Sequence, residues 1–187
     1  MPPFLSAATG AEARAEEAHY VARCRRGDDT ALRVLIARHR KRLVRIAANS
    51  LRDPHEAEDV VQETFLKAFR EIHRLRDDLA FAGFLYRICV RLCMDRLRSR
   101  RAEPGVVDQP VNSAGGAVET KVLVSSLLQH LSPDLRLTLV LREMEQLSYE
   151  EIAEAMDVPI GTVRSRLHAA RERFREIWLE ATKVEAP

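Results

Sequence analysis

The chain has 187 residues and a formal net charge of +2, with 46% hydrophobic and 31% charged residues. Glycine (7) and proline (8) are scarce, which excludes collagen-like and wholly disordered chains and fits a helical globular protein of one or two domains. Arginines interrupt every apolar run, so no stretch approaches the roughly 20 residues of a membrane span. The odd number of cysteines predicts no disulfide framework, and we expect a cytoplasmic protein without membrane insertion.

Charge is sorted along the chain. Residues 1–102 hold 21 Lys and Arg against 14 Asp and Glu, whereas residues 103–187 hold 9 against 14. The segment 33–52 contains seven basic residues and no acidic one, and the segment 143–157 contains six acidic residues and no basic one. Basic blocks of this kind indicate a polyanion partner, with solvated helix faces as the alternative.

Apolar periodicity predicts two helical domains. Residues 1–17 are small and polar without a clear period, and we expect a frayed or disordered lead there. Helical spacing runs over 18–102 and is broken near 26–29, 52–54 and 76–78, which predicts about four helices.

A Pro- and Gly-containing segment follows at 103–118 and predicts a linker. The second domain is expected at 119–187, with helical spacing from about 119 to about 181 and breaks at 131–133 and 157–159, and no segment alternates as a strand does. The predicted fold is all-α, with two small helical domains joined by a flexible linker.

The second domain contains a predicted helix-turn-helix. Ser148 and Glu151 have the spacing of a capping box at the start of one helix, and Pro159 suits the start of the next. In that second helix the apolar side chains form one stripe, and the opposite face and its flanks carry small, polar and basic groups suited to base edges and phosphates. The candidate DNA-binding residues are Gly161, Thr162, Arg164, Ser165, Arg166, His168 and Arg171. An ordinary amphipathic hairpin is the alternative, although the acidic run before this helix disfavours it.

The predicted helix 57–75 presents a polar face around one outward leucine. Its apolar stripe faces the core, and the opposite face carries Asp59, Gln62, Glu63 and Leu66. Such a face suits a protein partner better than DNA. From this helix alone, a solvated face with an incidental leucine is the simpler interpretation.

The predicted helix 84–101 is apolar almost all round, which indicates a largely buried helix. The remaining edge carries Arg87, Arg91, Arg98 and Arg101, with Asp95 beside them. Four cations on one edge repel each other unless phosphates run alongside. Phe84 and Tyr86 lie close to this edge and are candidates for stacking on unpaired bases, with core packing as the alternative.

Taken together, three segments resemble the sigma factors of bacterial RNA polymerase, in the extracytoplasmic-function (ECF) group. The first segment is 53–65, DPHEAEDVVQETF, and the second is 81–88, FAGFLYRI. The third comprises SYEEIA at 148–153 and GTVRSRL at 161–167. Their order and spacing make the match specific, whereas the last segment alone would fit many helix-turn-helix regulators.

The resemblance implies a role for each domain. It implies that Asp59, Gln62 and Glu63 dock on the core polymerase, which replaces the solvated-face interpretation. It implies that the −10 element is read by 75–81 and the edge from Arg87 to Arg98, and the −35 element by the helix-turn-helix. A cognate anti-sigma factor is a further expectation from the family. Phe84, Arg91 and Ala169 depart from the residues usual in relatives, so the preferred promoter sequence is not carried over.

The sequence contains no constellation typical of an enzyme. There is no phosphate-binding glycine loop, metalloprotease motif or paired nucleophile and base, so we expect no catalytic activity, no cofactor and no small-molecule substrate. Cys89 and Cys93 are one helical turn apart without a histidine nearby, so core packing is favoured over a redox role and no metal is expected.

Two other functional classes remain open from the residues. A stand-alone helix-turn-helix regulator would bind operator DNA without polymerase, but it leaves the face around Asp59 and Glu63 unexplained. A helical adaptor acting only through protein contacts leaves the arginine edge from Arg87 to Arg101 without a charge partner.

Overall fold

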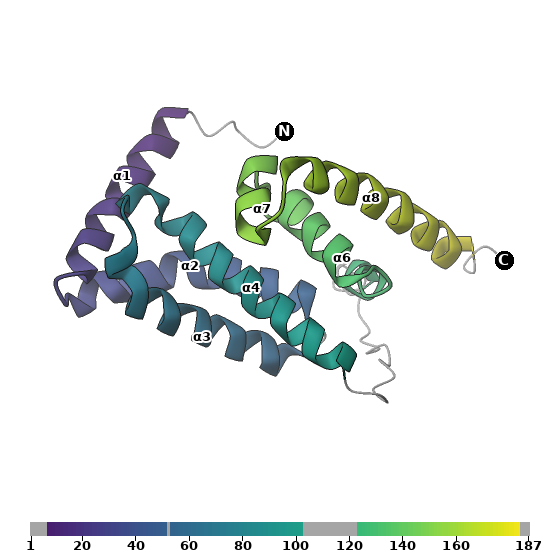
Figure 1. The fold of residues 1–187 in the computed structure, drawn as a ribbon, viewed down its shortest axis with the longest axis horizontal. Helices are drawn as coiled ribbons and strands as arrows, with labels where there is room; N and C mark the ends of the chain where they lie inside the picture. Colours follow the sequence, from purple (N-terminus) through teal and green to yellow (C-terminus); the bar gives the residue numbers. More distant parts are fainter. Residues whose placement is uncertain (1–6, 52, 103–122, 184–187) are drawn as a thin grey trace.

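The computed structural model describes residues 7–51, 53–102 and 123–183, and every regular element in these ranges is helical (Figure 1). The helices in chain order include α1 (Ala7–Cys24), α2 (Asp29–Ser50), α3 (Pro54–Glu71), α4 (Phe81–Ala102), α6 (Pro133–Leu139), α7 (Tyr149–Met156) and α8 (Ile160–Lys183), and residues 123–128 before α6 are also helical. Two 3₁₀ turns, η1 (Ile72–Arg74) and η2 (Asp78–Ala80), precede α4, and a π-helical turn, η3 (Val140–Met144), follows α6. The all-α class is therefore confirmed. None of the helices in the described ranges combines the length and apolarity needed to cross a bilayer.

Aspartates at the predicted breaks start the helices of the first domain. Asp28 accepts hydrogen bonds from the backbone N–H groups of Thr30 and Ala31 at the start of α2, at 2.9 and 3.1 Å. Asp53 does the same for α3, where Pro54 needs no hydrogen-bond partner for its nitrogen. The four helices expected from the sequence are present, and the third ends at Glu71 rather than continuing to residue 75.

The expectation of a disordered lead through residue 17 is wrong from Ala7 onward, because α1 starts there. Glu17 is only 8% exposed, and its Oε2 lies 2.8 Å from Nε2 of His39 on α2. Alanine, glutamate and arginine, which make up most of this segment, are strong helix formers. The contact that fixes α1 lies 22 residues away along the chain, beyond the reach of a local pattern.

The helix-turn-helix forms as the sequence predicts. Ser148 accepts from the N–H of Glu151 at 3.1 Å, and the Glu151 carboxylate accepts from the N–H of Ser148 at 2.7 Å, which completes the capping box. Asp157 ends α7 in the left-handed conformation at φ 56°, and α8 begins directly after Pro159. The turn between the two helices is therefore short, and the residues of the turn themselves end α7 and start α8.

The two domains pack against each other. One continuous group of buried apolar side chains joins α2 and α4 to α6, α7 and α8, and it includes Leu35, Leu85, Leu137, Ile152 and Val163. In Figure 1 α6 and α7 accordingly lie beside α2 and α4. The sequence predicts two domains, and its apolar periodicity does not predict that they pack against each other. The expected linker 103–118 and the start of the expected second domain at 119–122 lie outside the described residues.

Candidate nucleic-acid and protein interfaces

The outer face of α3 is polar around an exposed leucine. Asp59 and Gln62 are exposed, and the Leu66 side chain is 65% exposed. On the other side of the same helix Val61 and Phe65 are buried, so the expected separation of faces is present. An exposed leucine beside a carboxylate and an amide marks this face as a candidate surface for a protein contact.

Glu63 differs from its neighbours on this face because it is already paired. Its carboxylate lies 2.8 Å from Lys67 Nζ and accepts from Arg96 Nη2 of α4 at 3.1 Å. These hydrogen bonds, that from Lys67 first, lower the pKa of Glu63 below its ordinary value. Glu63 therefore fastens α3 to α4 as well as contributing charge to the face.

The arginine edge of α4 is partly open and partly covered. Arg91 is exposed, and Arg98 is exposed with its Nη1 3.6 Å from Oδ1 of Asp95. Arg87 instead donates to Oε1 of Glu154 on α7 at 2.8 Å. The side chain of Arg101 lies outside the described residues.

The expected stacking role of Tyr86 is wrong for this conformation. Tyr86 is only 6% exposed, and its hydroxyl accepts from Nη1 of Arg42 at 3.0 Å. Burial raises the pKa of the phenol. The ring lies on the side of α4 that faces α2, as the all-round apolar character of this helix allows. Phe84 is half-buried, and the guanidinium of Arg87 lies 5.9 Å from its ring centre.

The N-terminal half of α8 presents the predicted DNA-facing surface. On its inner face, Val163, Leu167 and Ala170 are buried in the core. The opposite face carries Gly161, Arg164, Ser165 and His168, which are all exposed, whereas Thr162 is half-buried. Ser165 Oγ donates to the carbonyl of Thr162 at 3.0 Å, so its lone pairs still face solvent. The exposed groups are of the kinds that read bases and phosphates.

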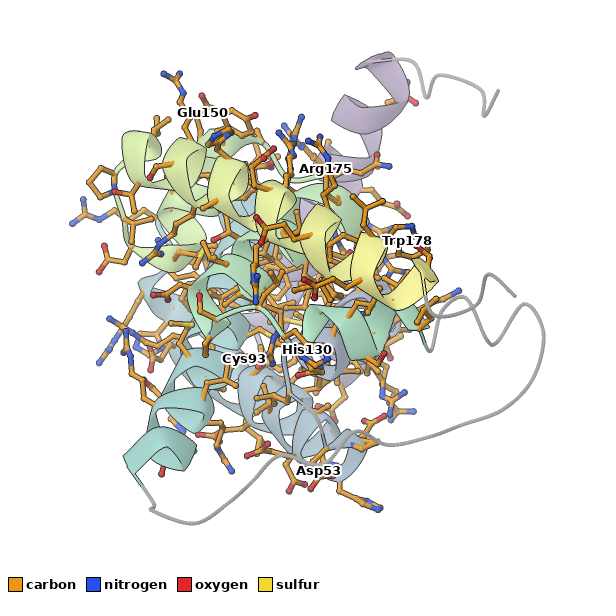
Figure 2. All side chains as sticks on the ribbon, turned by 90° about the vertical axis from the view of Figure 1, so that its right-hand side faces the viewer. Asp53, Cys93, His130, Glu150, Arg175 and Trp178 are labelled. Carbon is orange, nitrogen blue, oxygen red and sulfur yellow. The ribbon has the colours of Figure 1, made fainter. Side chains whose placement is uncertain are left out.

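The flanking arginines of α8 pair with acidic residues of the same domain. Arg166 Nη2 lies 3.2 Å from Oδ2 of Asp134, and Arg171 Nη2 lies 2.7 Å from Oε1 of Glu143. Both pairs are partly or largely exposed, so phosphates can compete for these guanidinium groups at little cost. Figure 2 shows Glu150 and Arg175 on the outside of this domain.

Three residues that the sequence did not single out meet between the domains. Oε2 of Glu145 accepts from Arg42 Nε at 2.9 Å and from Arg45 Nη2 at 2.8 Å, and Oε1 accepts from Arg45 Nε at 2.9 Å. Arg42 Nη2 also donates to the backbone carbonyl of Glu145. The Glu145 side chain is completely enclosed. We call Arg42, Arg45 and Glu145 the interdomain clasp; the only sequence signal for it is the opposite charge of 33–52 and 143–157.

The cysteines occupy packing positions. Cys89 and Cys93 are buried on α4, and Cys24 is half-buried. Cys93 is labelled in Figure 2. The hydrogen bond between Cys89 and Cys93, together with burial, holds the pKa of the Cys93 thiol well above its ordinary value. Within the described ranges, no group of three or more histidine, cysteine and acidic side chains is placed to hold a metal ion.

Two protein families match separate parts of the chain. The family described as Sigma-70 region 2 matches residues 35–103, and the family described as Sigma-70, region 4 matches residues 121–174. Among named relatives, the RNA polymerase sigma-H factor of Pseudomonas aeruginosa is 35% identical over 175 residues, which are 84% of this chain and 91% of the relative. The ECF RNA polymerase sigma-E factor of Escherichia coli strain K12 is 35% identical over 170 residues, which are 81% of this chain and 88% of the relative.

Solved structures share the fold. CnrH, in complex with the cytosolic domain of CnrY, superposes with a TM-score of 0.70 at 23% identity over 88% of this chain and 97% of that chain. The sigma factor RpoE from Bartonella quintana, in complex with the anti-sigma factor NepR, gives a TM-score of 0.63 at 23% identity over 82% of this chain and 98% of that one. Both likenesses extend over most of the chain, so the helical architecture as a whole is shared.

Proposed function

Because this chain belongs to the sigma-70 family of RNA polymerase sigma factors, in its ECF group, we propose that promoter recognition is divided between its two domains. As a sigma factor it directs promoter-specific initiation by core RNA polymerase, which sets aside the stand-alone operator-binding regulator. Residues 18–102 dock on the polymerase, recognise the −10 element and hold its separated strand. Residues 119–187 read the −35 element, and residues 103–118 connect the two.

The single observation that best supports this division is the exposed face of α8. Gly161, Arg164, Ser165 and His168 are presented together at the start of a helix that a short turn holds against α7. A recognition helix enters the major groove with its N-terminal residues toward the bases. Thr162 lies at the edge of this face, and Arg166 and Arg171 flank it, where they would contact phosphates after leaving Asp134 and Glu143.

The −10 surface is proposed to follow the open edge of α4. Arg91, Arg98 and, once released from Glu154, Arg87 would contact phosphates of the separated strand, and Asp95 would orient Arg98. Phe84 is half-exposed and is the aromatic ring available here for stacking on a base. Residues 75–81, which include the exposed Leu79, lead into this edge.

The polymerase-docking surface is proposed to be Asp59, Gln62 and Leu66, with Glu63 at its border. The exposure of Leu66 supports it, because an exposed leucine between polar groups suits the centre of a protein interface. The nucleotide chemistry belongs to the polymerase, so we propose no catalytic role for this chain, and we place its action in the cytoplasm with the chromosome.

A partner that withholds the protein from polymerase is also proposed. The ECF resemblance and the structural likeness to RpoE in complex with the anti-sigma factor NepR support a cognate anti-sigma factor. Release from such a partner in a stress or envelope response would then free the docking and DNA-reading surfaces together.

The docking surface is tested by copurification of the full chain with core polymerase. Asp59→Arg and Leu66→Ala should each reduce the amount of bound chain at least tenfold, because both groups are exposed and neither holds the fold. Glu63→Arg is a poorer choice, since it would set a third cation beside Lys67 and Arg96. Leu179→Ala removes a leucine that is 49% exposed on α8 and serves as the control. Unchanged copurification of Asp59→Arg and Leu66→Ala would exclude this surface.

A further inference from the structure

We propose that Arg25, which directly follows α1, is a positioning residue that holds residues 72–78 in the shape in which the chain reads the −10 element. The hold is inferred from contacts inside the first domain. Its consequence for promoters rests on the function proposed above, which assigns −10 recognition to 75–81 and the open edge of α4.

One guanidinium group reaches three points of the segment 72–78. Arg25 Nε donates to the carbonyl of Ile72 at 3.1 Å, and Arg25 Nη2 donates to the carbonyl of Leu75. Nη2 also lies 2.8 Å from Oδ1 of Asp78. A guanidinium is planar and its N–H groups point in fixed directions, so the three acceptors are held at fixed positions relative to each other.

The segment 72–78 has little regular structure of its own. η1 and η2 are single turns of three residues each, and Leu75 between them is extended at φ −70° and ψ 117°. The N–H of Leu75 donates to the carbonyl of Ile72 at 3.2 Å. The N–H of Ala80 donates to the carbonyl of Asp77 at 3.1 Å. Short 3₁₀ turns with such local bonds are weak by themselves, so the contacts from Arg25 decide how the two turns are placed.

The carboxylate of Asp78 makes this arginine difficult to replace. Its Oδ1 atom is enclosed, although the side chain as a whole is 24% exposed. An enclosed carboxylate oxygen is unfavourable without a cation or hydrogen-bond donors. Arg25 supplies the cation, so loss of the guanidinium favours movement of Asp78, and the segment with it, toward water.

The turn that carries Arg25 is itself fixed. Gly27 has a φ of 83°, which glycine adopts without strain at the end of a helix, and its N–H donates to the carbonyl of Cys24 at 2.9 Å. Arg23 Nε donates to Oδ2 of Asp28 at 2.8 Å, and the other oxygen of Asp28 caps α2. The anchor therefore has a defined backbone and does not move freely with the segment that it holds.

The segment held by Arg25 carries exposed side chains into the proposed −10 surface. Arg76 and Asp77 are exposed, Leu79 is 52% exposed, and Phe81 at the start of α4 is completely buried. α1 packs against η2, and Figure 1 shows the C-terminal end of α1 beside the start of α4. Residues 75–80 thus lie between the guanidinium of Arg25 and the buried ring of Phe81, with their exposed groups available to DNA.

The range of each interaction predicts what loss of Arg25 changes. Hydrogen bonds to bases require distances of about 2.7–3.2 Å, so a displacement of about 1 Å removes them. Attraction between arginines and phosphates extends over about 10 Å at ordinary salt and is little affected by the same displacement. Release of 72–78 should therefore weaken the choice among −10 bases more than it weakens general DNA binding. A merely structural role would lower initiation at all promoters by one factor.

Hydrogen exchange in the free full chain, measured by NMR, tests the hold itself. Arg25→Ala should raise the exchange rates of the Leu75 and Ala80 N–H groups about tenfold, because both turns then open locally. Arg25→Lys keeps a charge beside Asp78 but lacks the planar pair of donors, so it should give a smaller rise. It decides the result if circular dichroism shows that Arg25→Ala does not fold.

Two arginines of the same turn provide matched controls. Arg23→Gln removes an ion pair with Asp28 in which the arginine is 35% exposed, against 29% for Arg25. Arg26→Ala removes an exposed charge. Neither change should alter exchange of Leu75 and Ala80. Equal exchange in wild type and Arg25→Ala would overturn the hold.

Transcription by core polymerase with the full chain tests the effect on reading. The templates are genomic promoters that wild type selects, randomised at the −10 or the −35 bases and identified by a barcode in the transcript. Arg25→Ala should lower the ratio between the best and the worst −10 base about fivefold and leave the −35 ratios unchanged. Arg23→Gln and Arg26→Ala should retain both sets of ratios.

The two measurements separate the possible failures. A uniform loss of transcription by Arg25→Ala with unchanged −10 ratios would overturn the positioning role and leave a structural one. If wild type itself shows no preference among −10 bases, the reading function proposed for 75–81 fails, and the effect of Arg25 on promoters fails with it. Hydrogen exchange would still decide whether Arg25 holds 72–78.

Discussion

Arg87 of α4 and Glu154 of α7 form an ion pair across the domain boundary, with Nη1 of the arginine 2.8 Å from Oε1 of the glutamate. The two side chains are 42% and 61% exposed. Exposed pairs of this kind contribute about 0–1 kcal/mol, so the contact adds little to stability. Its importance lies in the choice of partner, because the arginine proposed to face the −10 strand is occupied by the domain proposed to read the −35 element.

Glu154→Gln should therefore raise affinity for single-stranded −10 DNA without weakening the fold. We expect the dissociation constant of the free protein, measured by fluorescence anisotropy at low salt, to fall about two- to threefold and the difference to vanish at high salt. Glu150→Gln removes one charge from the same helix and should change affinity less. Equal gains in affinity in the two variants would mean that net charge, and not release of Arg87, causes the effect.

Substitution of Arg164 or Ser165 should weaken recognition of the −35 element without affecting the other functions of the protein. Arg164→Ala and Ser165→Ala should each lower initiation at a promoter with an intact −35 element about tenfold, the loss expected when a specific base or phosphate contact of about 1–3 kcal/mol disappears. Arg173→Ala removes an arginine of the same helix that pairs with Glu176. The Arg173→Ala control should leave initiation unchanged. Normal initiation by both Arg164→Ala and Ser165→Ala would exclude this face of α8 as the surface that reads the −35 element.

Gln146 should be a site where glycine stabilises the fold. Its φ of 57° lies in the left-handed region, which costs a non-glycine residue about 1–2 kcal/mol. After the entropy of glycine in the unfolded chain is subtracted, Gln146→Gly should raise the free energy of unfolding by about 0.5–1 kcal/mol in urea titrations. Gln146→Ala retains the unfavourable φ and should give no gain. An equal gain from alanine would mean that the side chain, not the backbone, is responsible.

Alkylation rates should distinguish the three cysteines. The thiolate is the reactive form, and burial raises the pKa of Cys24, while the Cys89 hydrogen bond and burial raise that of Cys93 further. Iodoacetamide at pH 8 should therefore modify half-buried Cys24 first and the two α4 cysteines only in denaturant. Mass spectrometry of digested protein measures this order. Labelling of Cys93 in the native protein at the rate of Cys24 would contradict the packing described for α4.

Local chemistry made much of the fold predictable. Asp28, Asp53 and the Ser148–Glu151 pair mark helix starts by hydrogen bonds to residues two or three positions away, and the sequence shows them directly. The exposed face of α8 follows from periodicity in the same way. Each of these features depends on residues within one or two helical turns.

The features that sequence analysis missed depend on distant residues. Glu145 meets Arg42 across 103 positions, and the burial of Glu17 depends on His39, 22 positions away. Tyr86 appeared able to stack on a base because its helix position is near the arginine edge, yet α2 and Arg42 cover it. Opposite charge in 33–52 and 143–157 is visible in the sequence, but the basic segment predicts an external polyanion, whereas in the structure Arg42 and Arg45 pair with Glu145 of the chain's own second domain.

The most direct test of the central claim is run-off transcription with purified core RNA polymerase, this chain and a genomic promoter library. The account predicts that transcripts start downstream of paired −35 and −10 elements only when the chain is present, and that Asp59→Arg abolishes them. A core enzyme that starts transcripts at the same positions and rates with and without the chain would contradict it.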